Sequence, residues 1–413
     1  MPSCRLWQSS VRTPKRRRIL CLLTTREPSS PPLVGMGSDR QYMRIGILTY
    51  HYVLNYGAIL QALGSLKAIR SLGHDPVLVD YLPVWDLRLR RFRLGGSGGL
   101  GMGHIVSAAQ VQARFSEFSQ RHLSLSRPYR IPAEIGEDAG YYHAFVAGSD
   151  QVWNCRRFPK GSFDPIYFLG FAENTKAERV SYAACFGRPD QPEEQRPEMS
   201  RYLSSFENIS VRNGFSQELV KQLTGRDVPI VVDPVFLTDF EEETSPRREK
   251  KPYLLIYSVD KACGMKYAST IVKWARKLSL RTIAVTRWSI PGADEHRRAV
   301  SPSDWLALFR DAAYVCTDSF HGIAFSMKNR KPFTAFAVHS WRSLRLLDQL
   351  MRYGLGNRII TDQSSMPMGG EIDYTAVFRL LNEEVNSSYR YLNSALSDTP
   401  RPAYSVAALQ VRV

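Results

Sequence analysis

The sequence predicts an α/β protein made of two Rossmann-like domains that face a cleft. Short apolar runs rich in strand-forming residues alternate with helical patterns along most of the chain, which is typical of parallel sheets flanked by helices. This alternation restarts after a highly charged segment at 239–252. A length of 413 residues is ordinary for two or three domains.

The first βαβ unit begins the ordered part of the chain. The apolar run Arg44–Tyr50 predicts a strand, and residues 57–72 have apolar side chains at helical spacing. Gly73 then ends the helix, and Pro76–Tyr81 predicts the second strand. A crossover this short joins parallel strands.

The remaining elements follow the same alternation. We expect helices at 105–122, 192–206, 215–223, 266–278, 301–311, 323–327 and onward, 340–353 and 374–392. We expect further strands at 143–147, 179–186, 208–212, 229–232, 253–259, 281–286, 312–316 and 333–336. Residues 84–103, which are rich in Arg and Gly, predict a basic loop.

These elements define five segments. We expect a disordered basic N-terminal extension (1–42), an N-terminal Rossmann-like domain (43–238), a linker (239–252), a C-terminal Rossmann-like domain (253–372) and a C-terminal helix and tail (373–413). A later translation start, at Met36 or Met43, is an alternative explanation of the extension.

Charge and cysteine usage restrict the partners and the compartment. The net charge is +16, of which residues 1–42 contribute +6 through eight basic and two acidic side chains. This balance favours acidic partners, but no nucleic-acid-binding motif is present, so nucleic acid is disfavoured. Peripheral contact with an anionic membrane remains an alternative. The scattered cysteines predict neither a disulfide framework nor a metal site, so we expect no cofactor and a cytoplasmic location, with the inner face of the membrane as an alternative.

Polar turns at the predicted carboxyl ends of strands are the candidate functional sites, because open α/β sheets bind ligands there. The strongest candidate is the turn from Thr317 to Gly322, which opens a helix. Helix starts offer free N–H groups to anions, and His321 can transfer protons near neutral pH. The alternative is that Asp318 or Ser319 caps the helix and His321 is structural.

Three more turns complete the set: Asn55-Tyr56-Gly57, Gly148-Ser149-Asp150, and Arg212. Gly57 permits close approach of the backbone to a ligand. Arg212 offers a forked cation for phosphate or carboxylate, with a structural salt bridge as the alternative.

Seven blocks of the sequence, in this order, resemble the polysaccharide pyruvyl transferase family. They cover about residues 44–360 and are 45–50 with 55–61, 146–154, 180–184, 209–212, 232–237, 317–326 with 331–333, and 353–358. The resemblance implies a glycosyltransferase-B-like fold, with the acceptor on the side of residues 43–238 and the donor on the side of residues 253–372.

The resemblance also implies an activity: transfer of pyruvate from phosphoenolpyruvate to a saccharide or lipid-linked saccharide of a cell-surface polysaccharide, as a ketal. His321 occupies the position of the family's histidine and is expected to be catalytic. The expected substrate-binding residues are Asn55, Tyr56, Gly57, Ser149, Asp150, Arg212, Asp318, Ser319 and Gly322.

One departure from the family pattern concerns the donor. Better-known members have Arg-Leu-His where this chain has Ser319-Phe320-His321, so an arginine that can hold the donor is missing. Arg212, Arg287 and Arg330 are possible replacements. The alternatives to pyruvyl transfer are a glycosyltransferase of the same fold with a nucleotide-sugar donor, and a non-catalytic polysaccharide-assembly protein.

Overall fold

The structure is a computed structural model that describes residues 42–82, 102–157, 164–338, 340–361 and 371–397. The predicted basic loop lies almost entirely outside these residues, as does the predicted extension apart from Tyr42. The chain from Gln41 onward forms one compact unit.

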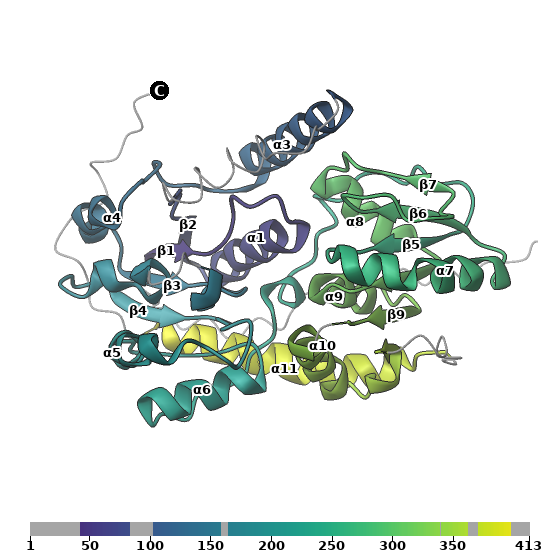
Figure 1. Cartoon of the computed structure of the whole chain (residues 1–413). Helices are drawn as coiled ribbons and strands as arrows, with labels where there is room; N and C mark the ends of the chain where they lie inside the picture. Colours follow the sequence, from purple (N-terminus) through teal and green to yellow (C-terminus); the bar gives the residue numbers. More distant parts are fainter. Residues whose placement is uncertain (1–41, 83–101, 158–163, 339, 362–370, 398–413) are drawn as a thin grey trace, which may run out of the picture. The chain divides into compact units, whose positions relative to one another are not determined.

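Strands and helices alternate as predicted (Figure 1). The strands are β1 (Arg44–Leu48), β2 (Asp75–Leu78), β3 (Ala144–Ala147), β4 (Glu178–Ser181), β5 (Tyr253–Tyr257), β6 (Arg281–Val285), β7 (Glu295–His296), β8 (Tyr314–Thr317), β9 (Phe333–Phe336) and β10 (Ile359–Ile360). The α-helices are α1 (Tyr56–Ser71), α3 (Met102–His122), α4 (Pro132–Asp138), α5 (Arg196–Ser204), α6 (Gly214–Thr224), α7 (Lys261–Lys277), α8 (Pro302–Asp311), α9 (Phe320–Lys328), α10 (Ser340–Arg352) and α11 (Tyr374–Ala395).

The first sheet has the order β2-β1-β3-β4, and all its strand pairs are parallel. The predicted βαβ unit is therefore confirmed. Side chains alternate between two apolar clusters, because successive residues of a strand point to opposite faces. Val146 of β3 packs in one cluster with α1, whereas Phe145 and Ala147 pack in the other cluster.

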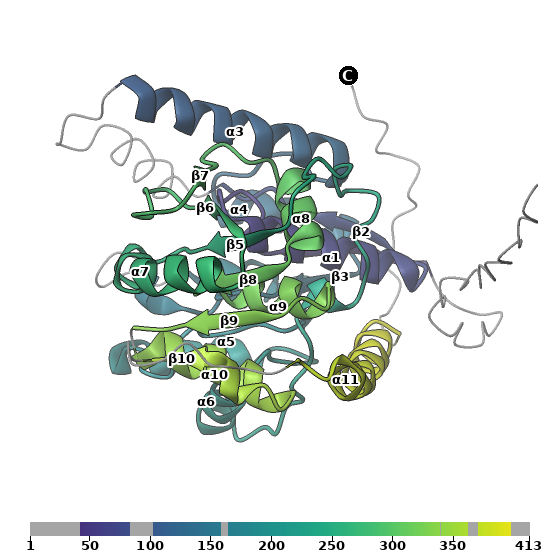
Figure 2. The ribbon, with the colours of Figure 1, turned by 90° about the vertical axis from the view of Figure 1, so that its right-hand side faces the viewer.

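The second sheet has the order β10-β9-β8-β5-β6-β7 and is also parallel throughout. Leu254 and Ile256 of β5 pack in a cluster with α7. Leu255 and Tyr257 pack in a different cluster, with residues of α8 and α9. Helices therefore cover both faces of this sheet (Figures 1 and 2), and the fold is α/β with two Rossmann-like sheets, as predicted.

The predictions of strands at 208–212 and 229–232 are wrong. Residues 208–212 and 229–232 form only isolated parallel bridges, which join Val180 to Asn208 and Val211 to Ala184 and Ile230. Ser181 and Ser210 exchange side-chain hydrogen bonds with each other's backbone at 3.0 Å, and such bonds compete with a regular ladder.

The C-terminal helix α11 contacts both halves of the chain. The Tyr374 hydroxyl donates to the carbonyl of Lys331 at 2.5 Å. Farther along α11, Ser388 Oγ accepts from Val232 N at 3.0 Å and the Tyr391 hydroxyl donates to the Ser181 carbonyl at 2.8 Å. The segment boundaries at 238, 252 and 372 stay predictions.

Candidate functional site

The loop between β8 and α9 is fixed by its own polar residues. Ser319 is the N-cap of α9, and its Oγ accepts from Gly322 N at 3.3 Å. The carboxylate of Asp318 accepts from Ser258 Oγ at 2.6 Å and from the backbone N–H groups of Val259 and Asp260 at 2.8 and 3.1 Å. Asp318 therefore ties this loop to the loop that follows β5.

His321 lies in the first turn of α9 and packs against the first turn of α1. A Cβ atom on Gly57 would lie 2.0 Å from Nδ1 of His321. Only glycine fits there without displacing the imidazole. Gly322 is equally constrained, because its Cβ would lie 2.1 Å from Thr317 Oγ1. The starts of two helices from the two halves of the chain therefore meet at His321.

Asp233 is the centre of the buried polar cluster beside this contact. Its Oδ2 accepts from Arg212 Nη1 at 2.6 Å and from Ser149 Oγ at 3.1 Å. The same oxygen lies 3.4 Å from His321 Nε2. Its Oδ1 accepts from Val235 N at 3.1 Å, which caps a short 3₁₀ turn. One carboxylate thus connects three of the loops that the sequence singles out.

The charges in this cluster stabilise one another. Burial opposes the ionisation of Asp233, but His321 and Arg212 hold the pKa of its carboxyl well below the usual range. For Arg212, burial alone would lower the pKa, but Asp233 reverses the effect and raises it. The guanidinium also lies over the Phe320 ring, with Cζ 4.3 Å from the ring centroid, a favourable cation–π distance. The positive charge of Arg212 is therefore compensated inside the protein by Asp233 and the Phe320 ring.

The loop after β3 contributes through backbone conformation. Asp150 has a φ of 76°, a left-handed conformation that costs a non-glycine residue about 1 kcal/mol or more. Its Oδ1 lies 3.7 Å from Arg212 Nη2 and accepts from Gln151 N at 2.7 Å. The Ser149 carbonyl accepts from Thr49 Oγ1 at 2.9 Å, which joins this loop to the end of β1.

The remaining predicted residues begin α1. Asn55 is the N-cap, and its Oδ1 accepts from Ala58 N at 3.1 Å. The Tyr56 hydroxyl donates to the carbonyl of Val300 at 3.0 Å, and its ring stacks on Trp305 with centroids 5.4 Å apart. Burial raises the pKa of the Tyr56 phenol. Both residues hold the start of α1 in place, and Tyr56 ties it to the second half of the chain.

Of the two other candidate cations, one lies near this place. The exposed Arg287 donates from Nη2 to the carbonyl of Leu54 at 3.2 Å, just before α1. Arg330 instead places its guanidinium 4.5 Å from the Phe378 ring centroid, on α11.

Sequence reasoning missed Asp233 as a site residue. The structure brings His321 against Gly57 and brings Arg212 close to Asp150. Asp233 contacts His321, Arg212 and Ser149, so it is the carboxylate that connects these loops. A signal was present, because Asp233 follows an apolar run, like the other polar residues at strand ends, and lies in the block 232–237 that resembles the family.

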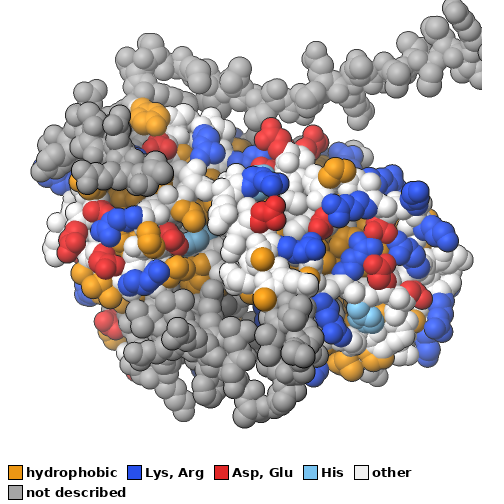
Figure 3. Space-filling view, turned by 90° about the horizontal axis from the view of Figure 1, so that it is seen from above, with side chains coloured by type: hydrophobic (Ala, Val, Ile, Leu, Met, Phe, Trp, Pro, Cys, Tyr) orange, Lys and Arg blue, Asp and Glu red, His pale blue; other side chains and the backbone are white. Residues whose placement is uncertain are grey.

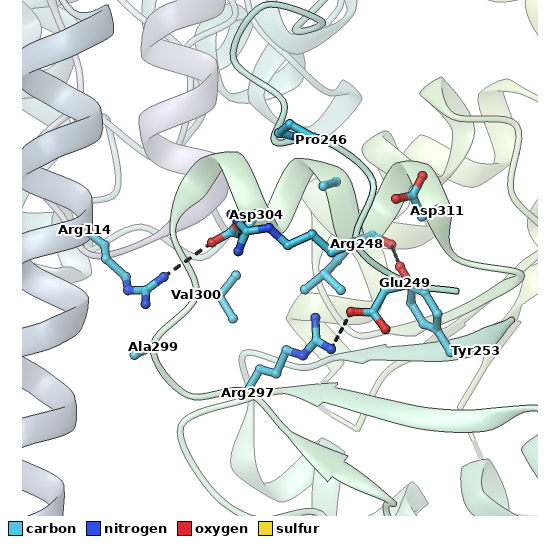
Figure 4. A pocket seen from close by; sticks show the side chains of 12 residues that line it. Arg114, Pro246, Arg248, Glu249, Tyr253, Arg297, Ala299, Val300, Asp304 and Asp311 are labelled. Carbon is cyan, nitrogen blue, oxygen red and sulfur yellow. Dashed lines mark hydrogen bonds and ion pairs between the residues drawn. The ribbon is translucent and has the colours of Figure 1, made fainter. Parts of the chain in front are cut away.

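A cavity of about 410 Å³ lies elsewhere, between the charged segment before β5 and α8 (Figure 4). Most of its charged side chains pair with each other: Asp304 with Arg114 at 3.4 Å and with Arg248 at 3.7 Å, and Glu249 with Arg297 at 2.6 Å. On the face in Figure 3, too, basic side chains lie beside acidic ones. None of the predicted site residues lines this cavity, so we place the candidate site at His321 on the strength of its contacts.

Within the described ranges, no group of three or more His, Cys, Asp or Glu side chains is arranged to hold a metal ion. The described helices also include none that is long and apolar enough to cross a membrane.

Comparison with known families assigns the chain, rather than any single residue, to a class of transferases. The family model for polysaccharide pyruvyl transferase matches residues 55–340, which is more than half of the chain. The chain belongs to the polysaccharide pyruvyl transferase family, and it is a transferase of that family.

Comparison with curated proteins gives no match. Among solved structures, the chain is similar to UGT89C1 from Arabidopsis thaliana, with 10% identity and a TM-score of 0.49 over 87% of this chain and 99% of that one. It is also similar to UDP-GlcNAc 2-epimerase from Methanocaldococcus jannaschii, with 9% identity and a TM-score of 0.43 over 88% and 95% of the two chains. Similarity at this level is not evidence of a shared activity.

Proposed function

We propose that this protein transfers pyruvate from phosphoenolpyruvate to two hydroxyls of a sugar in a cell-surface polysaccharide or its lipid-linked precursor, forming a ketal. The observation that carries the proposal, beside membership of the family, is the meeting of the starts of α1 and α9 at Gly57 and His321. N–H groups at helix starts attract anions, so the meeting of two such starts beside an imidazole supports the proposal.

The donor carries a phosphate and a carboxylate, so its site needs positive charge. The first N–H groups of a helix have no partner within the helix, and the helix dipole adds to their attraction for anions. Two such starts converge here. Arg287 lies beside the first one, through its hydrogen bond to Leu54. We assign the donor's anionic groups to these helix starts and to Arg287. Arg287 then takes the role of the family's arginine, whose position is occupied by Ser319 in this chain.

The reaction needs a proton carrier. The methylene carbon of the donor takes up a proton, which gives its neighbouring carbon oxocarbenium character. Two sugar hydroxyls then form two C–O bonds to that carbon and lose their protons, while the C–O bond to phosphate breaks and phosphate leaves. One hydroxyl proton balances the proton taken up by the methylene, and the other leaves with phosphate. We assign these proton transfers to His321, because histidine is the side chain that most often acts as a general acid or base.

The cysteines support a proposal about the compartment. Cys155, Cys185, Cys263 and Cys316 are buried free thiols in the described structure, which suits a reducing compartment. We therefore propose that the protein acts in the cytoplasm or at the inner face of the membrane.

The test is to incubate the full chain with phosphoenolpyruvate and a panel of saccharide acceptors, and to measure acceptor-dependent phosphate release. Phosphate release with a pyruvyl-sized mass increase on the acceptor supports the proposal. Calorimetric titration of phosphoenolpyruvate at two salt concentrations accompanies it, and binding should weaken as salt rises. Sugar transfer from a nucleotide sugar, without phosphate release from phosphoenolpyruvate, would overturn the proposal in favour of a glycosyltransferase.

A further inference from the structure

We propose that Asp233 is a positioning residue for His321. It holds the imidazole as the tautomer protonated at Nε2, so that Nδ1, at the start of α1, is the nitrogen that exchanges protons with the substrate. The choice of tautomer follows from the structure alone. The role of Nδ1 rests on the function proposed above.

The first step of the argument is the state of Asp233. Its side chain is fully buried, which raises the pKa of the carboxyl, but the Arg212 guanidinium 2.6 Å away lowers this pKa whether or not the His321 ring is charged. The carboxyl is therefore ionised at neutral pH. An ionised carboxylate accepts hydrogen bonds and donates none.

The second step concerns the nitrogen that faces this carboxylate. Nε2 of His321 is buried, lies 3.4 Å from Asp233 Oδ2, and has no hydrogen-bond partner with good geometry among the described residues. A bare Nε2 would point its lone pair at a negative oxygen. A protonated Nε2 instead meets an acceptor, and a small rotation of the ring brings the pair to hydrogen-bond distance. The neutral ring then has its lone pair on Nδ1.

The third step concerns the surroundings of Nδ1. This edge of the ring lies against Gly57, where a Cβ atom would approach Nδ1 to 2.0 Å. Gly57 belongs to the first turn of α1, where the proposed donor's anionic groups bind. A basic nitrogen at this position can exchange a proton with a donor or acceptor held by the helix starts, whereas Nε2 is occupied by Asp233.

Arg212 and Ser149 support the arrangement without competing for the imidazole. Both side chains donate to Asp233 Oδ2, the oxygen that the imidazole faces. They therefore fix the orientation of the carboxylate. Arg212 in turn is held by the Phe320 ring, one residue before His321. Among the other ionisable side chains near the cluster, Asp150 lies 3.7 Å from Arg212, and Tyr257 interacts with Ser319.

The test is ¹⁵N NMR of the full chain labelled at histidine nitrogens, without substrate, at a pH where the ring is neutral. The His321 signals are assigned by their loss in His321→Gln. The long-range ¹⁵N–¹H pattern distinguishes the two tautomers. We expect the Nε2-protonated form in the wild-type protein. An Nδ1-protonated ring, or an equal mixture, would overturn the proposal.

Two variants sharpen the result. Asp233→Asn removes the charge, so the preference for Nε2–H should weaken and turnover with phosphoenolpyruvate should fall at least about tenfold, with a smaller change in the donor KM. Ser149→Ala removes a neighbouring hydrogen bond but keeps the carboxylate, so the tautomer should not change. A folded Asp233→Asn protein with an unchanged tautomer and turnover would contradict the positioning role.

The outcomes separate this proposal from the proposed function. An Nε2-protonated ring in a protein that fails to transfer pyruvate leaves the tautomer assignment intact and removes the proposed function. Pyruvate transfer by a protein whose ring is Nδ1-protonated supports the proposed function and removes the tautomer assignment.

Discussion

The Arg212 guanidinium donates to the Asp233 carboxylate at 2.6 Å, and neither side chain is more than 2% exposed. The two residues lie in different loops of the chain. Together they form a compensated pair of charges next to His321, whose Nε2 lies 3.4 Å from Asp233 Oδ2. A buried pair of this kind contributes little net stability while it is intact, but removing one partner leaves an uncompensated charge in the interior.

We therefore expect Asp233→Asn to lower the free energy of unfolding by about 3–5 kcal/mol, because Arg212 would remain buried without its counter-ion. Urea denaturation at pH 7 measures the loss. The double variant Arg212→Met/Asp233→Asn should lose less than the sum of the single variants. Asp239→Asn is the control, since its side chain is 70% exposed. A loss below about 1 kcal/mol for Asp233→Asn would show that water or a rearrangement compensates Arg212.

Gly57→Ala tests the contact between the two helix starts. The added methyl group would overlap the His321 ring, and such overpacking costs about 1–3 kcal/mol. We expect a folded protein with a moderately lowered melting temperature and at least tenfold lower turnover, because the imidazole must move. Gly140→Ala is the matched control, since nothing lies within 4 Å of its Cβ position. Equal turnover in both variants would separate Gly57 from the chemistry.

The sequence predicted the turns but not how they join. Hydrophobic period and strand-end polarity depend on local residues, so they located β1, β8 and the starts of α1 and α9 within a few residues. The link between His321 and Arg212 through Asp233 depends on tertiary packing, which no local pattern contains. Ser319 illustrates the same limit, because a cap and a ligand-binding residue have the same local sequence, and the structure shows the cap.

Arg287→Gln tests the proposed donor-binding cation. Removing an exposed charge beside the start of α1 should raise the KM for phosphoenolpyruvate about tenfold and reduce the salt dependence of binding, with little change in melting temperature. The measurement is phosphate release at varied donor concentration. Arg330→Gln is the control, because its guanidinium packs on Phe378 instead. A larger effect in Arg330→Gln would reverse the assignment.

Lys328 predicts a pH dependence of stability. Burial lowers the pKa of its ammonium to about 8, while the unfolded chain keeps the ordinary value near 10.4. Between these values the unfolded state binds more protons than the folded state, so this residue makes stability rise as pH increases from about 8 to 10. Below pH 8 the lysine is charged in both states, and burying that charge costs up to about 3 kcal/mol.

Lys328→Met should therefore be more stable than the wild type at pH 7, and the difference should shrink towards pH 10. Denaturant unfolding at several pH values measures this difference. Because wild type and variant are compared at the same pH, the contributions of other titrating groups cancel. Methionine also loses the hydrogen bond from Lys328 Nζ to the Thr238 carbonyl, which reduces the gain at every pH. Lys273→Met, at an exposed position, should show no such trend. A pH-independent difference for Lys328→Met would mean that the lysine stays charged when folded.

His321 provides the most direct test of the chemistry. Its ring lies between Asp233 and Gly57 and is 7% exposed, so removing it changes the site while most of the fold is held elsewhere. His321→Ala should lower turnover by roughly 10²–10⁴-fold, the usual contribution of a positioned acid or base. His321→Gln keeps hydrogen-bonding groups but cannot titrate, so it should do little better. A histidine that only fills space or caps α9 would behave differently, since glutamine would then restore most of the activity and alanine would act through stability. Acceptor-dependent phosphate release is measured for both variants, with circular dichroism and melting curves as controls. Near-wild-type turnover in a folded His321→Gln protein would exclude proton transfer by this residue.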